Sequence, residues 1–563
     1  MPRISTIKLM SKYDQWWQDS VIYQIYPFTF ADVNGDGIGD LQGIIQRLDY
    51  INDGHPERQS SLGIDAIWLC PIYPSPMVDN GYDVSHYTDI HPSLGTLADF
   101  NRLLHEAHQR DIKVILDLVI NHTSDQHDWF AQSRTSQDNP KADWYIWHDP
   151  TQEGQVPNNW MSYLGGSGWT FDSQRQQYYF HTFSPHQPDL NWRHPPMREA
   201  IFEVIRFWLD RGVDGFRLDA SSVYSKDPEF RNNPLKFGIT DADGYSSYHH
   251  LYDKNLPDNH QIIADIRKVL DEYGHKVLIG ETFIDNQIYD SVAFYGADQD
   301  ELDLAFSFEL PFSPWYPGYL HRAIVKQERL VPDPDWPTYF LDNHDLPRHL
   351  SRWVDCSLCT DTTALAKAAA TLLLTLRGTP VLYYGQELGM EDNLEIPPEQ
   401  QKDKASSPDQ KDGQSSRDGA RTPMQWDCSV HAGFSFGKAV EPWLPVHPNA
   451  AEVNVERESE DPNSILNFYR QLLRIRKQSK ALRRGAWKSL IAYPHEHLAY
   501  TRTTDRETIL ILINFSGAKE IDLGLSCKGD RWRVLLSTEL SIDEVDEVPT
   551  TLKPFEVSIL RQE

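Results

Sequence analysis

Three carboxylic acids in this sequence follow short apolar runs, and two of them stand close to a basic side chain or a histidine. Asp219 lies in GVDGFRLDA with Arg217 two residues earlier, Glu281 lies in KVLIGETF, and Asp345 follows His344 in YFLDNHDLPR. One carboxyl group can protonate the oxygen of a glycosidic bond while another attacks the anomeric carbon or activates water. A guanidinium beside a carboxyl favours its ionised form. The set indicates acid–base chemistry on a sugar acetal.

A single acid at a strand end is more often a cap than a catalyst. The case for chemistry therefore depends on whether the fold brings the three acids together. Eight short apolar runs are predicted to be buried strands: Val21–Pro27, Ala66–Pro71, Val114–Ile120, Val213–Leu218, Val277–Gly280, Leu302–Phe308, Thr338–Leu341 and Pro380–Tyr384.

Amphipathic stretches separate many of these runs, for example Leu97–Gln109, Arg198–Asp210 and Ala364–Leu376. Alternation of strand and helix predicts a parallel sheet of the α/β class, and eight units suit a closed (β/α)8 TIM barrel. Active sites of such barrels lie at the carboxyl ends of the strands. Asn121 and His122 follow the third run, as the three acids follow the fourth, fifth and seventh.

Two long interruptions and a change of pattern predict the domain organisation. The Trp-, Gly- and Pro-rich stretch after the third run lacks a helical period, the polar stretch after the eighth run is a long loop, and short strands follow from about residue 484. We expect a barrel of residues 1–122 and 191–483 with its eighth loop at 391–426, an inserted lobe at 123–190, and an antiparallel β-sandwich at 484–563.

The composition restricts the kinds of binding partner that we expect. The 563 residues carry a formal charge of −29 and include 40% hydrophobic residues. Such a surface repels phosphate backbones and anionic lipids, so neither nucleic acid nor membrane is an expected partner, whereas a neutral small molecule is unaffected. Five scattered cysteines, including the lone pair Cys356 and Cys359, form no disulfide or zinc pattern. No signal-like or membrane-length apolar run occurs, so a cytoplasmic location is expected.

The segments DVNGDGIGDL, DNGYDV, VINHTS, GFRLDA, IGET, NHD and RTPMQWD closely resemble motifs of the α-amylase superfamily, glycoside hydrolase family 13, over roughly residues 16–430. The narrower resemblance is to its α-glucosidase and oligo-1,6-glucosidase branch. It implies a retaining enzyme in which Asp219 is the nucleophile, Glu281 the acid and then the base, and Asp345 the residue that stabilises the transition state. Retention needs the two reacting carboxyls about 5 Å apart, and inversion about 6.5–9.5 Å.

The resemblance also implies a set of substrate-binding residues. His122 and His344 would bond sugar hydroxyls, and Arg217 would orient Asp219. Tyr82 would stack on the first glucose. The resemblance further implies that Asp79 pairs with Arg421 and closes the pocket, and that Phe183 and Gln187 face the pocket from the inserted lobe.

The implied activity is an exo-acting α-glucosidase that takes a small oligosaccharide. In the family, Val beside the nucleophile accompanies α-1,6 preference, so Ala220 favours α-1,4 substrates such as maltose. A difference of one methylene in the pocket discriminates between substrates by about 1–3 kcal/mol. The alternatives are a transglucosidase, an oligo-1,6-glucosidase, a sucrose- or trehalose-acting enzyme, an isomerase, and a non-catalytic sugar-binding relative. The sequence leaves the oligomeric state open.

The stretch from Asp32 to Asp40 spaces oxygen atoms at alternate positions. A hard cation would be held by side chains and one carbonyl, namely Asp32, Asn34, Asp36, Ile38 and Asp40. The stretch lacks the flanking helices and terminal Glu of an EF-hand, and a hydrogen-bonded Asx turn explains the same pattern. Because relatives bind calcium here, the resemblance implies structural Ca²⁺, with Mg²⁺ as the other candidate.

Overall fold

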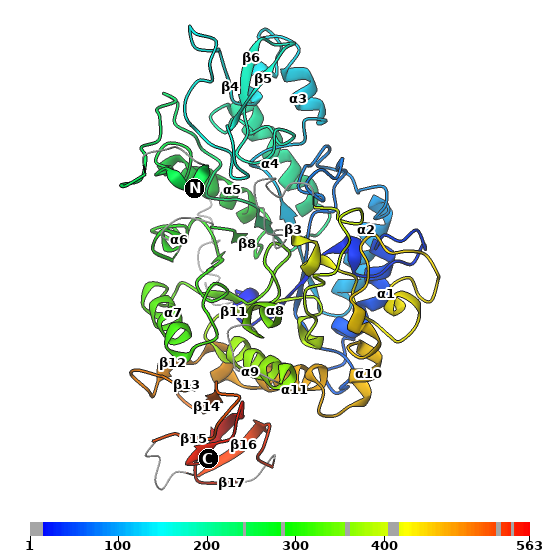
Figure 1. Ribbon diagram of the computed structural model, residues 1–563, viewed down its shortest axis with the longest axis vertical. Coiled ribbons are helices and arrows are strands. Elements are labelled where there is room, and N and C mark those ends of the chain that lie inside the picture. The colour runs from blue at the N-terminus through cyan, green and yellow to red at the C-terminus, as the bar shows by residue number, and fades with distance from the viewer. Residues whose placement is uncertain are drawn as a thin grey trace, which may run out of the picture.

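The computed structural model describes residues 15–239, 244–282, 288–354, 361–403, 416–524, 531–541 and 545–563. Cys356 and Cys359, and residues 404–415 of the expected eighth loop, lie outside these ranges. Within them the chain forms a central barrel, with the inserted lobe and the C-terminal domain at opposite ends of the long axis (Figure 1).

The barrel is an eight-stranded parallel sheet with the order β10-β11-β1-β2-β3-β7-β8-β9, and a parallel bridge between Phe306 and Thr338 joins its two edges. Every strand predicted from the sequence is present, each within a few residues of its expected bounds. The strands are β1 Ile22–Ile25, β2 Ala66–Leu69, β3 Lys113–Leu118, β7 Gly215–Leu218, β8 Val277–Gly280, β9 Leu304–Ala305, β10 Thr338–Phe340 and β11 Thr379–Tyr383.

Apolar side chains fill the barrel and explain why these short runs are strands. Ile22, Trp68, Ile115, Ile279 and Val381 belong to one buried cluster inside it. Strands buried on both faces are continuously apolar, as the sequence showed. The inward-facing rows stop at the carboxyl ends of the strands, where polar residues take over.

Helices surround the barrel, and the first two begin with side-chain caps. Thr96 and Asp99 form a capping box at the start of α2, and the Asp40 carboxylate accepts from Gly43 N at the start of α1. The helices of the described ranges are α1 Leu41–Ile51, α2 Leu97–His108, α3 Asp128–Ser133, α4 Pro195–Leu209, α5 Pro257–Asp271, α6 Ile288–Ala293, α7 Pro317–Leu330, α8 His349–Val354, α9 Thr362–Thr375, α10 Val455–Glu460, α11 Ile465–Gln478 and α12 Lys480–Arg484.

The inserted lobe follows β3, as predicted. It contains α3 and a three-stranded antiparallel sheet of β4 Trp147–His148, β6 Gln177–Phe180 and β5 Trp169–Asp172. Trp160, Trp169 and Phe180 form its own small core. Because the lobe leaves and rejoins the barrel at the carboxyl ends of the strands, its loops border the mouth of the barrel.

The C-terminal domain consists of two antiparallel sheets, as predicted. The larger sheet has the order β12-β13-β14-β19-β16-β17 and the smaller one pairs β15 with β18, and Leu510, Ile521 and Leu552 share one core between them. The strands are β12 Ala486–Ser489, β13 His497–Thr503, β14 Thr508–Asn514, β15 Ile521–Asp522, β16 Trp532–Ser537, β17 Val545–Asp546, β18 Thr551–Leu552 and β19 Val557–Gln562.

Candidate active site

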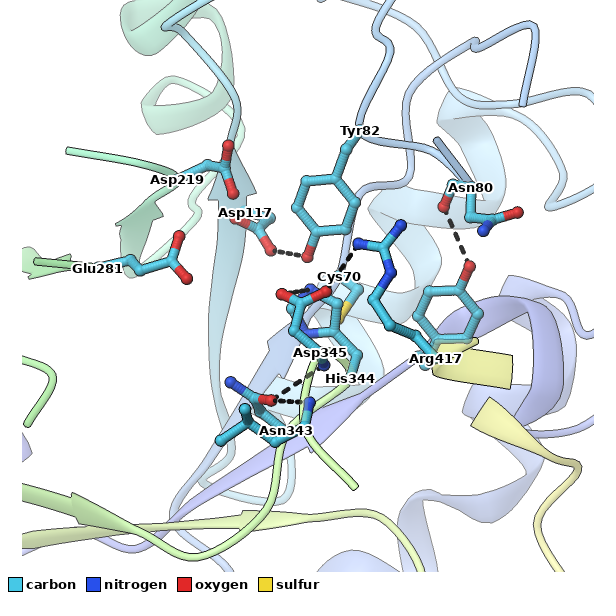
Figure 2. Close-up of polar contacts among 12 residues, drawn as sticks. Cys70, Asn80, Tyr82, Asp117, Asp219, Glu281, Asn343, His344, Asp345 and Arg417 are labelled. Atoms are coloured by element: carbon cyan, nitrogen blue, oxygen red, sulfur yellow. Dashed lines mark hydrogen bonds and ion pairs between the residues drawn. The ribbon is translucent and has the colours of Figure 1, made fainter. Parts of the chain in front are cut away.

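A cavity of about 390 Å³ opens at the carboxyl ends of the barrel strands. Asp219, Glu281 and Asp345 all line it. Their carboxylates point into the space bounded by the ring of Tyr82 (Figure 2). The structure therefore brings together the three acids that the sequence singled out.

Arg217 holds the two acids that directly follow β7 and β8, Asp219 and Glu281. Its buried guanidinium donates through Nη1 to Asp219 Oδ1 at 2.8 Å and to Asp117 Oδ1 at 2.7 Å, and Nη2 lies 2.8 Å from Glu281 Oε2. Parallel pairing sets Arg217 opposite Asp117 of β3 and Ile279 of β8, so the side chain lies between both neighbours. One planar fork therefore keeps the carboxylates of Asp219 and Glu281 close together.

Burial raises the pKa of Asp219 well above its usual range, while the charge of Arg217 opposes that shift. The carboxyls of Glu281 and Asp117 raise the pKa of Asp219 further. Loss of the Arg217 contact would therefore raise the pKa of Asp219 still further.

The backbone after Asp219 fixes Glu281 from the other side. Ala220 has a left-handed backbone with φ of 46°, and its N–H donates to Glu281 Oε2 at 3.0 Å. Residues other than Gly rarely adopt this conformation, which costs about 1–3 kcal/mol and is found at active sites. In the same turn the Tyr224 hydroxyl donates a hydrogen bond to the Asp219 carbonyl at 2.8 Å. The sharp turn at Ala220 therefore positions the two acids relative to each other.

Asp345 lies among cations at the other side of the cavity. Its carboxylate is 3.0 Å from His344 Nε2 and 2.9 Å from both Arg417 Nη1 and Arg421 Nη2. Burial by itself would raise the pKa of Asp345, but these cations lower it well below the usual range. Burial would likewise lower the pKa of His344, yet the Asp345 carboxylate outweighs it and raises that pKa to about 10. Asp345 is therefore ionised at any physiological pH.

The predicted pairing of Asp79 with Arg421 is wrong, because Asp79 pairs with another arginine. Asp79 Oδ1 accepts from Arg417 Nη2 at 2.7 Å, and Arg421 instead bonds the His344 carbonyl and Asp345. The two arginines are the first and last residues of the short 3₁₀ helix Arg417–Arg421. Arg417 thus bridges Asp79 and Asp345, which closes this end of the cavity with one side chain.

The remaining predicted residues surround this closed end. Tyr82 stacks in parallel on His344 with ring centroids 5.0 Å apart and donates to Asp117 Oδ2 at 2.9 Å. Burial lowers the pKa of His122, so its ring is neutral, and it meets the edge of Phe183 at 5.4 Å. Gln187 donates to Asp79 Oδ2 at 2.9 Å. All eight predicted binding residues therefore line the cavity or contact a residue that does.

Two residues that matter here were not singled out from the sequence. Asp117 is the third acid on Arg217, and Arg417 is the closing cation. Asp117 is a charged residue inside the apolar run VILDLV, where a strand buried on both faces rarely carries an acid, and that anomaly was the available signal. No comparable signal marks Arg417, because its loop has no regular pattern.

The loop from Asp32 to Asp40 lies apart from the cavity and is closed by its own hydrogen bonds. Asp32 accepts from Gly35 N, Gly37 N and the Ser435 hydroxyl, and Asp40 accepts from three backbone N–H groups. Within the described ranges no three acidic, histidine or cysteine side chains are grouped as metal ligands. The oxygen donors suit a hard cation by type, and the hydrogen bonds hold the two buried carboxylates in an Asx-turn arrangement.

None of the helices in the described part of the chain is long and apolar enough to cross a bilayer.

Comparison with known proteins agrees with the fold and the site. The family model for the alpha amylase catalytic domain matches residues 24–485, and that for the maltogenic amylase C-terminal domain matches 490–559. An oligo-1,6-glucosidase of Parageobacillus thermoglucosidasius is 37% identical over 97% of this chain and 99% of its own. A probable alpha-glucosidase of Rhizobium meliloti (strain 1021) is 40% identical over 91% of each chain.

A solved structure covers the chain equally well. The trehalulose synthase MutB of Pseudomonas mesoacidophila MX-45, as an inactive double mutant in complex with isomaltulose, superposes with a TM-score of 0.85 at 35% identity over 97% of this chain and 99% of that one. A barrel with paired carboxylates at its mouth and this degree of similarity defines a glycoside hydrolase. The chain belongs to the α-amylase family, and within it to the α-glucosidase group.

Proposed function

We propose that this protein is an exo-acting, retaining α-glucosidase that removes terminal glucose from maltose and short malto-oligosaccharides. The observation that carries this proposal is the single guanidinium of Arg217 bonded to both Asp219 and Glu281. Carboxyls held this close suit direct attack on the anomeric carbon, since an inverting enzyme needs a wider gap to admit water.

The reaction follows from the positions of the two acids. Glu281 gives its proton to the glycosidic oxygen as the C1–O bond breaks, and an Asp219 oxygen forms a bond to C1 on the opposite face. Water then attacks C1, Glu281 takes the proton of that water, and Asp219 leaves as a carboxylate. Asp345, ionised and fixed by its cations, stabilises positive charge that develops on the sugar ring.

Closure at Arg417 supports exo action. A chain of glucose units running past both ends of the cavity would have to displace the bridge between Asp79 and Asp345. These half-buried charges are hydrogen-bonded to each other, so separating them has an electrostatic cost that a chain passing through would have to offset. A terminal glucose fits against the bridge instead, with its hydroxyls facing Asp345, Arg417 and His122.

Incubation with maltose and with nitrophenyl α-glucoside tests the proposal. Glucose and nitrophenol are the expected products, and from longer substrates glucose should be released at the non-reducing end. Folded protein that releases neither from any α-glucoside contradicts it. A rate series on maltose, isomaltose, sucrose and trehalose then tests the α-1,4 preference inferred from Ala220 and separates the sucrose- and trehalose-acting alternatives.

Transglucosylation is the second candidate, because the same glucosyl-enzyme serves hydrolysis and transfer. The similar structure of a trehalulose synthase favours it, since that name describes a sugar rearrangement rather than hydrolysis. Exclusion of water at the mouth decides between the outcomes. Product analysis at high maltose concentration separates them: glucose alone means hydrolysis, and new di- and trisaccharides mean transfer.

We further propose that the Asp32–Asp40 loop binds Ca²⁺ and that the ion has only a structural role. None of the five predicted ligands lines the cavity, and all of them are oxygen donors. Chelation is expected to lower the melting temperature and leave kcat/KM unchanged, and Asp36→Asn is expected to abolish the stabilisation by added Ca²⁺. A melting temperature that ignores both Ca²⁺ and chelator contradicts this role.

A further inference from the structure

Another cavity, which we call the α7 groove, lies where helix α7 of the barrel meets the C-terminal domain beside β12 and β13 (Figure 1). Its volume is about 930 Å³, and its lining residues do not overlap with those of the catalytic cavity. His321 of α7 forms a hydrogen bond of 2.9 Å with the Ser489 hydroxyl of β12. Gly318 lies against the Pro494 carbonyl, which a Cβ at this position would approach to 3.2 Å. The groove is therefore bounded by two domains in direct contact.

One wall of the α7 groove is basic. Arg322, Lys326 and Arg329 line it from α7, at spacings of four and three residues that place them on one face of the helix. Like charges at these spacings destabilise a helix. The chain has 82 acidic residues against 53 basic ones, so a face with three cations is opposite in sign to the protein as a whole. Glu309, which also lines the groove, pairs with Lys326.

The two arginines of this wall have no counter-ion. Neither Arg322 nor Arg329 forms an ion pair within the described part of the chain, and the Arg322 guanidinium instead lies 5.0 Å from the ring centre of Tyr319. Glu328 precedes Arg329 in the sequence but pairs with Arg377 at 2.8 Å. Both guanidinium groups therefore remain available to an anion that enters the groove.

The opposite wall of the α7 groove is the turn between β12 and β13, residues 492–495. Tyr493 in this turn is 82% exposed, so its ring takes no part in a core. An exposed aromatic ring offers a flat face on which another planar ring can stack, as nucleic-acid bases do on aromatic side chains. The groove thus combines unpaired guanidinium groups on one side with a free ring on the other.

We propose that the α7 groove binds an organic polyphosphate, with its phosphate groups on Arg322 and Arg329 and its planar ring against Tyr493. Guanidinium groups bind phosphate oxygens through paired, charge-assisted hydrogen bonds. Arg322 and Arg329 are seven residues apart, about 10 Å along the helix axis, and Lys326 lies between them. A chain of linked phosphates matches this spacing better than a single phosphate ion does. The proposal does not depend on the α-glucosidase function, because the two cavities are separate.

Titration calorimetry of the full-length protein tests the proposal, at low ionic strength and with chelator present. Tripolyphosphate and adenosine triphosphate are expected to bind once per chain, the nucleotide more tightly, and inorganic phosphate about tenfold more weakly than tripolyphosphate. Added salt should weaken all three, because it screens the cations. Absence of binding by both polyphosphates, or equally tight binding of inorganic phosphate, overturns the proposal. Tighter binding of poly-glutamate than of tripolyphosphate also overturns it, because that result indicates an acidic protein partner.

Substitutions place the binding in the α7 groove. Arg322→Gln and Arg329→Gln are each expected to weaken both polyphosphates about three- to tenfold, and to leave the melting temperature unchanged because both side chains are exposed. Tyr493→Ala should weaken the nucleotide by a similar factor and leave tripolyphosphate unaffected. Arg506→Gln, at an exposed arginine of the β13–β14 turn, is the matched control and should change neither affinity. Wild-type affinity in the double variant of Arg322→Gln and Arg329→Gln overturns the proposal.

Discussion

The closed end of the cavity, at Asp79 and Arg417, and its mouth, at Tyr163 and Tyr245, are built in opposite ways. At the closed end, residues at strand ends and in the helix Arg417–Arg421 join in ion pairs of 2.7–3.0 Å, and burial strengthens each of them. At the mouth, Tyr163 of the inserted lobe meets Tyr245 and Phe183 through ring contacts. The barrel and the helix Arg417–Arg421 therefore build the closed end, and segments added to the barrel line the opening of the cavity.

The largest effect is expected from Asp219→Asn. The amide cannot form the glucosyl-enzyme, so kcat/KM should fall by at least about 10⁴-fold on every substrate, whatever occupies the mouth. Steady-state rates on maltose and nitrophenyl α-glucoside measure it. Asp505→Asn, on an exposed hairpin of the C-terminal domain, is the control. Residual activity above one hundredth of the wild-type value would mean that another group is the nucleophile.

Glu281→Gln is expected to distinguish leaving groups. Loss of a general acid costs about 10²–10⁴-fold when the leaving oxygen needs a proton. Glucose leaving from maltose needs that proton, whereas nitrophenolate leaves readily without it. The loss in the first step should therefore be much greater on maltose. An equal loss on the two substrates would contradict the role of Glu281 as acid.

Arg417→Ala tests the closed end. Removing this cation takes away the ion-pair partner that Asp79 and Asp345 share, so kcat/KM should fall about 10²-fold with any leaving group. Longer malto-oligosaccharides should suffer less than maltose if the bridge excludes them. Arg506→Ala, at an exposed arginine, is the matched control. Unchanged rates would show that the bridge has no part in holding glucose.

Ala220→Val is expected to have a smaller effect, confined to linkage. A branched residue fits poorly at φ of 46° and narrows the cavity beside the nucleophile. The ratio of isomaltose to maltose kcat/KM should rise about tenfold, in line with a pocket change of about 1–3 kcal/mol. Ala220→Gly, which keeps the backbone and adds no bulk, should leave the ratio as it is. A fall of the ratio in the Val variant would contradict the inference.

The pH dependence of stability is a subtler test of the closed end. The folded pKa of His344 is about 10 against an ordinary 6.5, so its stabilisation is complete below pH 6.5 and is lost as the pH rises toward 10. Urea unfolding of wild type and His344→Gln across this range measures it. The difference in unfolding free energy between them should shrink as the pH rises. A constant difference would mean that His344 is not charged in the folded protein.

Sequence reasoning succeeded where chemistry and periodicity coincide. The eight strands and the acids after them follow from apolar runs that end in polar residues, because a parallel barrel brings all such ends to one mouth. It failed where an irregular loop decides the contact. Arg417 and Arg421 are four residues apart and equally basic, so only the path of the loop decides that Arg417 reaches Asp79. The ring contacts of the mouth likewise depend on loop paths.

The account depends most on the proximity of Asp219 and Glu281, held by one arginine, and hence on a covalent intermediate. The anomeric form of the first glucose released reports on this directly. Proton NMR during the first turnovers of nitrophenyl α-glucoside or maltose hydrolysis should show α-glucose before mutarotation produces the β form. Initial appearance of β-glucose would mean a single inverting displacement and would contradict the central claim.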